Sequence, residues 1–253
     1  MKVTFLGTGT SQGVPVIGCQ CAVCRSLDFR DKRLRTSAHV EVDGQSLIID
    51  SGPDFRQQVL ANDITRLDGL LFTHQHKDHV AGMDDVRSFN FMQKKAMPVY
   101  ARDTVIAQLE REFAYVFAKD KYPGVPQVEV QTIANEPFEV QGITVVPIEV
   151  LHYKLPVFGF RIRDFTYITD AKYIADAEKE KIYGSKVLVL NALQHNQHIS
   201  HLTLEEALDL AKELQPQQTY LTHISHRLGK HREVATTLPE GVALAYDGLT
   251  INI

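Results

Sequence analysis

Four potential metal-binding side chains within six residues constrain this chain more than any other feature of its sequence. In the segment LLFTHQHKDHVAGMDD, an apolar β-type run ends at Thr73 and is followed by His74, His76, Asp78 and His79. Alternate residues of an extended chain point the same way, so His74 and His76 can reach one cation. Asp78 and His79 follow the bend and can reach a second cation. Imidazole and carboxylate ligands together suit Zn²⁺, Mn²⁺ or Fe.

Short β-type runs recur along the whole chain, and helical patterns separate several of them. The runs occupy residues 2–7, 37–50, 67–74, 97–101, 142–152, 158–170, 186–192, 218–223 and 243–253. Two of the runs contain Asp-Gly pairs that are typical of tight turns, Asp43-Gly44 and Asp247-Gly248. Such an arrangement predicts an α/β protein in which helices cover the faces of sheets.

Two segments carry helical periodicity. Residues 103–117 begin on Asp103, which we expect to cap the helix, and residues 203–214 begin on Thr203, with Glu206 placed for a capping box. Residues 118–127, AKDKYPGVPQ, predict a surface loop. Because no repeat or composition-shifted linker interrupts the 253 residues, we expect a single domain over residues 1–253.

Charge and hydropathy argue against several classes of protein. With 27 basic and 31 acidic residues, the formal charge of −4 argues against a dedicated nucleic-acid binder. No stretch approaches the roughly 20 apolar residues that span a bilayer, and the N-terminus lacks the apolar core of a signal peptide. We therefore expect a cytoplasmic protein without a membrane partner, a setting in which structural disulfides are rare.

All three cysteines lie in the stretch GCQCAVC, at Cys19, Cys21 and Cys24. An odd number of thiols leaves one without an intramolecular disulfide partner. The C-x-C-x-x-C spacing is that of a soft-metal clip, in which one imidazole would complete a tetrahedron suited to Zn²⁺. Three ordinary reduced cysteines are the alternative, and spacing alone leaves it open.

The H-x-H-x-D-H motif resembles the signature of the metallo-β-lactamase-fold hydrolases. The opening FLGTGTSQGVP, the LIIDSG strand and the late THISH occur in the family's order. The resemblance implies an αββα sandwich of two mixed β-sheets flanked by helices, and further ligands that match His152, Asp170 and His223. Two divalent ions, Zn or Mn, would then be held by His74, His76 and His152 and by Asp78, His79 and His223, with Asp170 bridging both.

The cysteine loop narrows the resemblance to the PhnP-like phosphoribosyl cyclic phosphodiesterases, which are relatives of the tRNase Z branch. The stretch GCQCAVC after SQGVPVIG, the segment LTHISHRL and the ending LPEGVALAYDGLTI carry this match. In that group a comparable loop and the second histidine of T-H-I-S-H hold a structural zinc. The resemblance therefore implies a closed site with a clip loop at about residues 18–25 and the ligands Cys19, Cys21, Cys24 and His226.

The reaction that this resemblance implies is hydrolysis of a small cyclic phosphodiester, such as phosphoribosyl 1,2-cyclic phosphate, by attack of a metal-bridging hydroxide. A nucleotide is the other small-molecule substrate we consider. Asp78 and Asp170 would be catalytic as well as metal-binding. Order within the resemblance selects His201, ahead of His198 and His195, as an extra active-site histidine that protonates the leaving alkoxide or stabilises phosphoryl charge.

Several alternatives stay open at this stage. Asp50 either orients metal ligands or merely closes a strand, and Lys154 either contacts a phosphate or is solvated. A tRNase Z-like nuclease would use the same metal ligands, although the chain has no basic, glycine-rich arm to hold tRNA. A thioester or lactone hydrolase could also use them, whereas a binding module without turnover would be expected to lack a ligand. A homodimer is possible, and no segment points to its interface.

Overall fold

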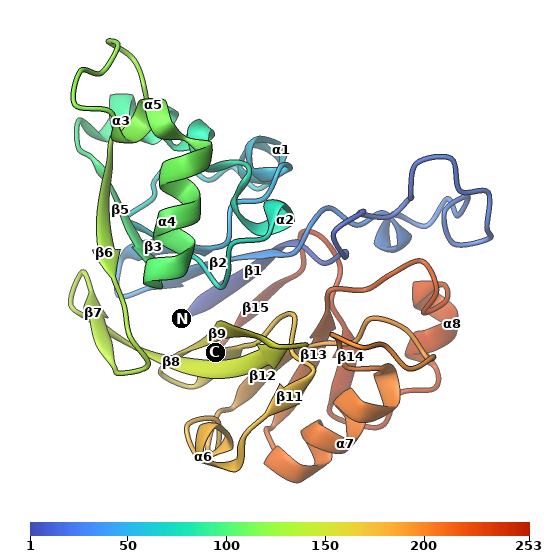
Figure 1. The fold of residues 1–253 in the computed structure, drawn as a ribbon. Coiled ribbons are helices and arrows are strands. Elements are labelled where there is room, and N and C mark those ends of the chain that lie inside the picture. The colour runs from blue at the N-terminus through green and yellow to red at the C-terminus, as the bar shows by residue number, and fades with distance from the viewer.

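The computed structural model describes residues 1–253, which form two stacked β-sheets with helices on both outer faces (Figure 1). The strands are β1 (Lys2–Gly7), β2 (Ser37–Val42), β3 (Gln45–Ile49), β4 (Gly69–Leu71), β5 (Met97–Ala101), β6 (Val128–Thr132), β7 (Phe138–Val140), β8 (Ile143–His152), β9 (Leu155–Ile162), β10 (Phe165–Tyr167), β11 (Tyr173–Ile174), β12 (Val187–Asn191), β13 (Gln218–Thr222), β14 (Val242–Leu244) and β15 (Thr250–Asn252). The helices are α1 (Phe55–Ala61), α2 (Lys77–Val80), α3 (Arg87–Gln93), α4 (Asp103–Glu112), α5 (Ala114–Phe117), α6 (Asp176–Lys179), α7 (Leu204–Leu214) and α8 (His231–Ala235), with 3₁₀ turns at Phe29–Asp31 and Met83–Val86. None of these helices combines the length and apolarity that crossing a bilayer requires.

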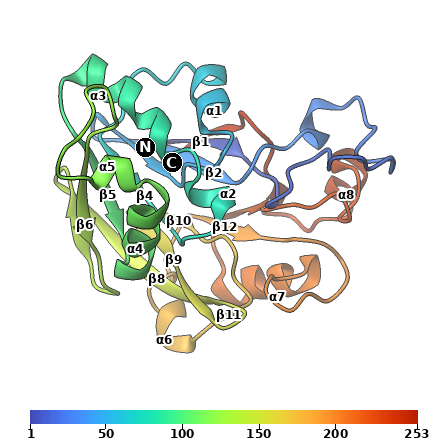
Figure 2. The same cartoon turned by 45° about the horizontal axis from the view of Figure 1, so that its top comes forward.

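Both sheets are mixed. The first has the order β15-β1-β2-β3-β4-β5-β6, antiparallel from β15 to β3 and parallel from β3 to β6. The second has the order β11-β8-β9-β10-β12-β13-β14, antiparallel from β11 to β10 and parallel from β10 to β14, with β7 paired to β8. Helices α1 to α5 cover the first sheet and α6 to α8 the second, so the predicted αββα architecture is confirmed (Figure 1, Figure 2).

Apolar side chains on both faces of the strands hold the layers together. On β3, Leu47 and Ile49 join the core between the sheets, whereas Ile48 joins the core beneath the helices of the first layer. In the second layer, Leu190 of β12 packs with Leu210 of α7. The strands are buried on both faces, which explains the continuous apolar runs in the sequence, because burying polar side chains on either face would cost free energy.

The local predictions have mixed outcomes. The capping box is confirmed, because the Glu206 backbone N–H donates to Thr203 Oγ1 (3.2 Å) and Glu206 Oε2 accepts from the Thr203 N–H (2.8 Å). The expected cap at Asp103 is wrong. Arg102 is the N-cap, and Asp103 is already the first helical residue, a position that favours an acidic side chain through the helix dipole. The expected helix also breaks at Phe113, where the backbone leaves helical geometry.

The two Asp-Gly turns differ in what they connect. Asp43 and Gly44 both have positive φ, at 50° and 72°, and join β2 to β3 as a two-residue hairpin. Asp247 and Gly248 lie between β14 of the second sheet and β15 of the first. The Asp-Gly pair therefore located a turn in both places, but only the pairing of the strands shows that the second turn carries the chain from one sheet to the other.

Residues 10–36 form an arm that projects from the body beside α8 (Figure 1, Figure 2). Arg33, which is buried, anchors the arm by donating to Thr8 Oγ1 and to the Ala245 carbonyl oxygen, both at 2.7 Å. Asp31 Oδ1 accepts the His231 backbone N–H at 2.7 Å. These charged hydrogen bonds fix the base of the arm against the C-terminal part of the chain.

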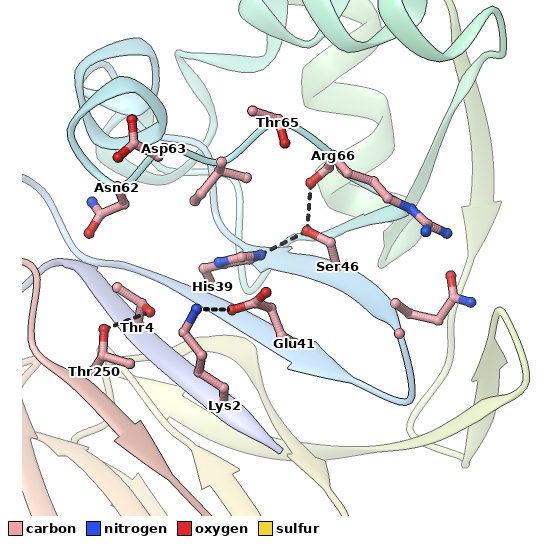
Figure 3. A pocket seen from close by; sticks show the side chains of 13 residues that line it. Lys2, Thr4, His39, Glu41, Ser46, Asn62, Asp63, Thr65, Arg66 and Thr250 are labelled. Atoms are coloured by element: carbon pink, nitrogen blue, oxygen red, sulfur yellow. Dashed lines mark hydrogen bonds and ion pairs between the residues drawn. The ribbon is translucent and has the colours of Figure 1, made fainter.

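A polar pocket of about 280 Å³ lies on the outer side of the first sheet (Figure 3), and none of the seven candidate metal ligands lines it. Ser46 Oγ donates to the Arg66 carbonyl oxygen (2.6 Å), so His39 Nε2–H is the donor to Ser46 Oγ (2.7 Å). Burial lowers the pKa of His39 from 6.5 to about 4, which keeps its imidazole neutral in the folded protein.

This neutral histidine predicts a loss of stability in acid. The unfolded chain binds a proton on His39 near pH 6.5 and the folded chain only near pH 4, so acidification through that window favours unfolding. His39→Gln should remove about 2 kcal/mol of the fall in unfolding free energy between pH 7 and pH 5. Urea denaturation of both proteins at the two pH values measures this difference. An identical pH dependence in the two proteins would contradict the assignment.

Candidate metal centre

The structure brings the seven predicted ligands together where strands end. His74 and His76 follow β4, His152 ends β8, Asp170 follows β10 and His223 follows β13. Asp78 and His79 lie in α2, a single turn that begins directly after His76. The donor atoms fall into two sets whose members lie within 4.8 Å of one another: His74, His76 and His152, and Asp78, His79 and His223. These are the two sets that the family resemblance implies for two cations.

Asp170 lies between the two sets. Its Oδ2 is 3.3 Å from His79 Nε2, and its Oδ1 is 3.2 Å from His223 Nε2. Its carboxylate also groups with His74 and with His152 inside the same 4.8 Å limit. Asp170 is therefore the one carboxylate that reaches ligands of both sets, which is the arrangement expected of a bridging ligand.

Fixed hydrogen bonds orient three of the ligand histidines. Thr73 Oγ1 donates to Asp50 (2.8 Å) and so accepts His74 Nδ1–H (3.0 Å), which leaves His74 Nε2 directed at the centre. His79 Nδ1 donates to Asp50 Oδ2 (2.7 Å). His152 Nδ1 donates to the carbonyl oxygen of Ser200 (2.9 Å). Such outer partners set the tautomer of a ligand imidazole and raise its basicity.

Asp50 thus orients ligands and does not merely close a strand. It is fully buried, and its Oδ1 also accepts the Thr73 backbone N–H at 2.8 Å. The sequence left the two roles of Asp50 open and gave no signal for Thr73 or Ser200, because their contacts depend on how distant strand ends meet. Lys154 is exposed in the β8–β9 turn, and its ammonium lies over the Tyr153 ring.

The backbone at the site is held in uncommon geometry. Asp50, Asp170 and His223 all have positive φ, between 54° and 64°, where residues other than glycine are rare. Gly52 is required for close packing, since a Cβ there would lie 2.0 Å from the Asp78 carbonyl oxygen. The loop after β3 therefore packs directly against α2, and this contact positions α2 beside the candidate metal centre.

The donor chemistry fits cations at this centre. Buried His79 Nε2 and His223 Nε2 have no aligned hydrogen-bond partner, and His74 Nε2 lies 3.0 Å from His76 Nδ1. Burial opposes ionisation of Asp170, but His223 and His79 hold the pKa of its carboxyl well below its usual range. Unprotonated nitrogens and ionised carboxylates facing one point are what Zn²⁺ or Mn²⁺ requires, so the two clusters fit a dinuclear site.

The cysteine cluster forms a second, separate site in the arm. The Sγ atoms of Cys19, Cys21 and Cys24 lie 3.2, 3.5 and 3.5 Å from His226 Nδ1. The Cys24 backbone N–H lowers the pKa of Cys21 to about 6, whereas burial and the neighbouring sulfurs raise the pKa of Cys24 to about 11. A cation would allow all three thiols to ionise, so the cluster fits a closed structural metal site.

The three histidines of segment 195–201 differ in their distance from the candidate metal centre, in the order in which the sequence analysis ranked them. His201 Nε2 donates to Asp170 Oδ1 (3.0 Å), and its ring stacks on His223 at 4.8 Å. Burial lowers the pKa of His201 to about 4, with the Asp170 hydrogen bond opposing the shift. His198 contacts His201 through their Nδ1 atoms (3.2 Å). His195 turns away and donates to the Leu228 carbonyl oxygen (2.9 Å).

Comparison with known proteins agrees with this fold. Residues 45–224, more than two thirds of the chain, match the model of the β-lactamase superfamily domain. The chain therefore belongs to the β-lactamase superfamily. A solved structure described as a new diphosphatase from the PhnP family is 41% identical and has a TM-score of 0.93, with 100% of this chain and 97% of that chain covered. Within the superfamily, this chain belongs to the PhnP family.

Two other relatives help to define the comparison. The Zn²⁺-bound PqqB from Methylobacterium extorquens shares the fold, at 22% identity and a TM-score of 0.83, with 100% of both chains covered. A curated octanoyltransferase of Porphyromonas gingivalis is 40% identical over 252 residues. That match includes 98% of this chain but only 51% of the octanoyltransferase, so the chain spans about half of that relative.

The buried Asp50 leads to a testable prediction for the metal centre. Asp50→Asn keeps the shape of the side chain but removes the negative charge that supports His79, so metal affinity should fall by roughly 10- to 100-fold. Competition with a chromophoric chelator measures this affinity. Asp63→Asn, in the turn after α1, is the matched control and should bind metal as the wild type does. Unchanged affinity in Asp50→Asn would show that Asp50 has no supporting role.

Proposed function

We propose that this protein hydrolyses a phosphorus–oxygen ester bond in a small phosphodiester, with a cyclic phosphate such as phosphoribosyl 1,2-cyclic phosphate as the substrate we favour. The observation that carries the proposal is the pair of three-residue ligand sets, with Asp170 between them and His201 beside Asp170. The similarity to a PhnP-family diphosphatase supports chemistry at phosphorus. Free thiols in the clip favour a reducing compartment such as the cytoplasm.

The proposed residue roles follow from their placement. His74, His76 and His152 would hold one divalent ion, and Asp78, His79 and His223 the other, with Asp170 shared. When bound, such a pair polarises phosphoryl oxygens and makes water nucleophilic at neutral pH. Asp78 and Asp170 supply negative charge that balances the cations and holds the neighbouring imidazoles in place.

His201 has the role of a proton donor or hydrogen-bond donor in this proposal. In the hydrolysis, the oxygen of water bonds to phosphorus, the ester P–O bond breaks, and the departing alkoxide takes a proton. His201 Nε2–H, which lies 3.0 Å from Asp170, is placed at the edge of the reacting centre to stabilise or protonate that oxygen. The product of ring opening is a phosphomonoester with a free hydroxyl group.

One finding favours a second candidate, hydrolysis of an acyl thioester. The curated relative with 40% identity is named for transfer of an octanoyl group, and the same metal ligands could serve attack on a carbonyl carbon. Because this chain spans only 51% of that protein, the named activity is not carried over to it. An octanoyl thioester therefore belongs among the substrates tested.

Phosphorus NMR of the metal-loaded protein tests the proposal. The substrates are phosphoribosyl 1,2-cyclic phosphate, a 2′,3′-cyclic nucleotide, a linear dinucleotide and a diphosphate ester. Hydrolysis of an octanoyl thioester is followed separately by release of its thiol. We expect ring opening of a cyclic phosphate. Turnover of the linear dinucleotide alone would favour a nuclease, and thiol release without phosphorus chemistry would favour the thioesterase. Either of these results would overturn the cyclic phosphodiesterase proposal.

A further inference from the structure

The polar pocket on the outer side of the first sheet is separate from the metal centre (Figure 3). Its floor consists of side chains from β1, β2, β3 and β15, and the loop of residues 62–66 that follows α1 lies across from them. Ile64 is the one hydrophobic residue in its lining. The free donor and acceptor atoms of the other side chains therefore define what the pocket can bind.

Hydrogen bonds hold the loop and the strands in fixed relation. Ser46 Oγ of β3 donates to the Arg66 carbonyl oxygen (2.6 Å), and the Ser46 backbone N–H donates to Asp68 Oδ2 (3.0 Å). On the floor, a hydrogen bond of 3.0 Å joins the hydroxyl groups of Thr4 in β1 and Thr250 in β15. The shape of the pocket is therefore part of the fold and does not depend on a free loop.

His39 presents an unpaired acceptor to the pocket. The residue is only 6% exposed, and its Nε2–H donates to Ser46 Oγ (2.7 Å). In the neutral imidazole, Nδ1 therefore carries a lone pair, and this atom is not fully buried and forms no hydrogen bond with the protein. A ligand must place an N–H or O–H donor there, because the oxygen of a carboxylate or phosphate would meet the lone pair.

Two further acceptors lie on the loop across the pocket from His39 (Figure 3). Asn62 Nδ2 donates to the Gln58 carbonyl oxygen (2.9 Å), so Asn62 Oδ1 is the free end of that amide. The Asp63 carboxylate is exposed and forms no hydrogen bond or ion pair with the protein. Acceptors on both sides, with the apolar Ile64 next to Asp63, favour a ligand that has a donor at each end and an apolar middle.

The two cations of the lining are already paired with carboxylates. Lys2 Nζ lies 2.5 Å from Glu41 Oε2, and Arg66 Nε lies 2.8 Å from Asp68 Oδ2. Asp63 is therefore the one charged residue of the lining without a partner of opposite charge. An ammonium group matches this lining, because it supplies N–H donors to the acceptors and a positive charge to Asp63.

We infer that this pocket binds a small aliphatic diamine, with one ammonium group donating to His39 Nδ1 and the other paired with Asp63. The methylene groups between the two nitrogens pack against Ile64. The pocket shares no residue with the metal centre, so the inference does not rest on the proposed function. A bound diamine links the loop to the sheet, and it should raise Tm because it binds only the folded protein.

Calorimetry with three molecules of the same chain length tests the class of ligand. These are 1,4-diaminobutane, 1,4-butanediol and succinate, each titrated into the metal-loaded protein. We expect one diamine to bind per chain, the diol to bind about tenfold more weakly or less, and succinate not to bind, because charged hydrogen bonds to Asp63 are available only to the diamine. Absence of diamine binding, or a diol or succinate that binds as tightly, would overturn the inference.

A matched pair of substitutions tests the position of the ligand. Asp63→Asn should weaken diamine binding about tenfold. The fold should be kept, because asparagine also tolerates the positive φ of 50° at this position. Asp43→Asn is the control: Asp43 has the same φ in the neighbouring β2–β3 turn, pairs with Arg163 and does not line the pocket. Equal affinity in Asp63→Asn and Asp43→Asn would exclude the site.

Nitrogen-15 NMR of histidine-labelled protein tests the contact with His39. Addition of the diamine should move the Nδ1 signal of His39, and the spectrum of His39→Gln identifies which signal that is. A diamine that binds without moving this signal would lie elsewhere, for example on the metals, and the inference would be wrong. Thermal melts verify that each variant is folded.

Discussion

Asp170→Ala is expected to lower kcat/KM by about a thousandfold or more while the protein stays folded. The Asp170 carboxylate reaches ligands of both predicted cations, and it accepts hydrogen bonds from His201 Nε2 (3.0 Å) and Thr169 Oγ1 (2.6 Å). Without it, the two cations lose their shared ligand, and the pair acts as a unit in catalysis. Steady-state kinetics on whichever phosphodiester the wild type turns over, together with metal analysis, measures the effect.

Asp176→Ala is the matched control for this substitution. Asp176 is also an aspartate of the second layer, but its side chain is 95% exposed and lies at the start of α6. The control should keep wild-type turnover and metal content. Activity of Asp170→Ala within tenfold of the wild type, with an intact fold, would contradict the assignment of the whole dinuclear site.

Cys24→Ser should have the largest effect on stability. Cys24 is the buried sulfur of the clip, and its Sγ accepts the Val16 backbone N–H. The apolar cluster that supports this part of the arm is small and consists of Val14, Val23 and Cys24. A structural zinc supplies much of the folding free energy of such a small unit. Replacing the Cys24 thiol should therefore reduce the metal content by one ion per chain and lower Tm by roughly 10 °C.

Limited trypsin digestion gives a local readout of the same substitution. Arg25 and Lys32 lie in the arm, so loss of the clip metal should make cleavage there faster. Ser26→Ala, in the same loop, should keep the wild-type metal content, Tm and cleavage rate. If Cys24→Ser retains all three wild-type properties, the cysteines are ordinary reduced thiols and the clip is not a metal site.

Each candidate ligand of the metal centre has a local mark in the sequence. His152, Asp170 and His223 each end a β-type run, and strand ends meet at one edge when sheets stack. The motif around His74 fixed the order of four more ligands. That motif depends only on residue type and spacing, whereas His152, Asp170 and His223 were assigned through the family resemblance; the structure brings all seven side chains together.

The supporting residues could not be found in the same way. Thr73 and Ser200 are common residue types with no pattern of their own, and their roles depend on contacts with His74 and His152. Asp50 was left between two roles for the same reason.

The pairing of the terminal strands shows a similar limit. The run 243–253 reads as two strands around a turn, yet β14 pairs in parallel with β13 and β15 pairs antiparallel with β1. Asp103 also has a good residue type for a cap, but Arg102 occupies that position. In both cases local propensity gave the correct kind of element, and tertiary packing decided its partner or its boundary.

Hydrolysis in water enriched with ¹⁸O tests the central claim most directly. If water attacks phosphorus, each turnover of a cyclic phosphodiester places one ¹⁸O on the phosphomonoester product, which phosphorus NMR detects as an isotope shift. We predict a labelled phosphate and an unlabelled sugar hydroxyl. A label in the sugar hydroxyl with an unlabelled phosphate, or a label found only in octanoate released from a thioester, would contradict a phosphodiesterase that acts at phosphorus.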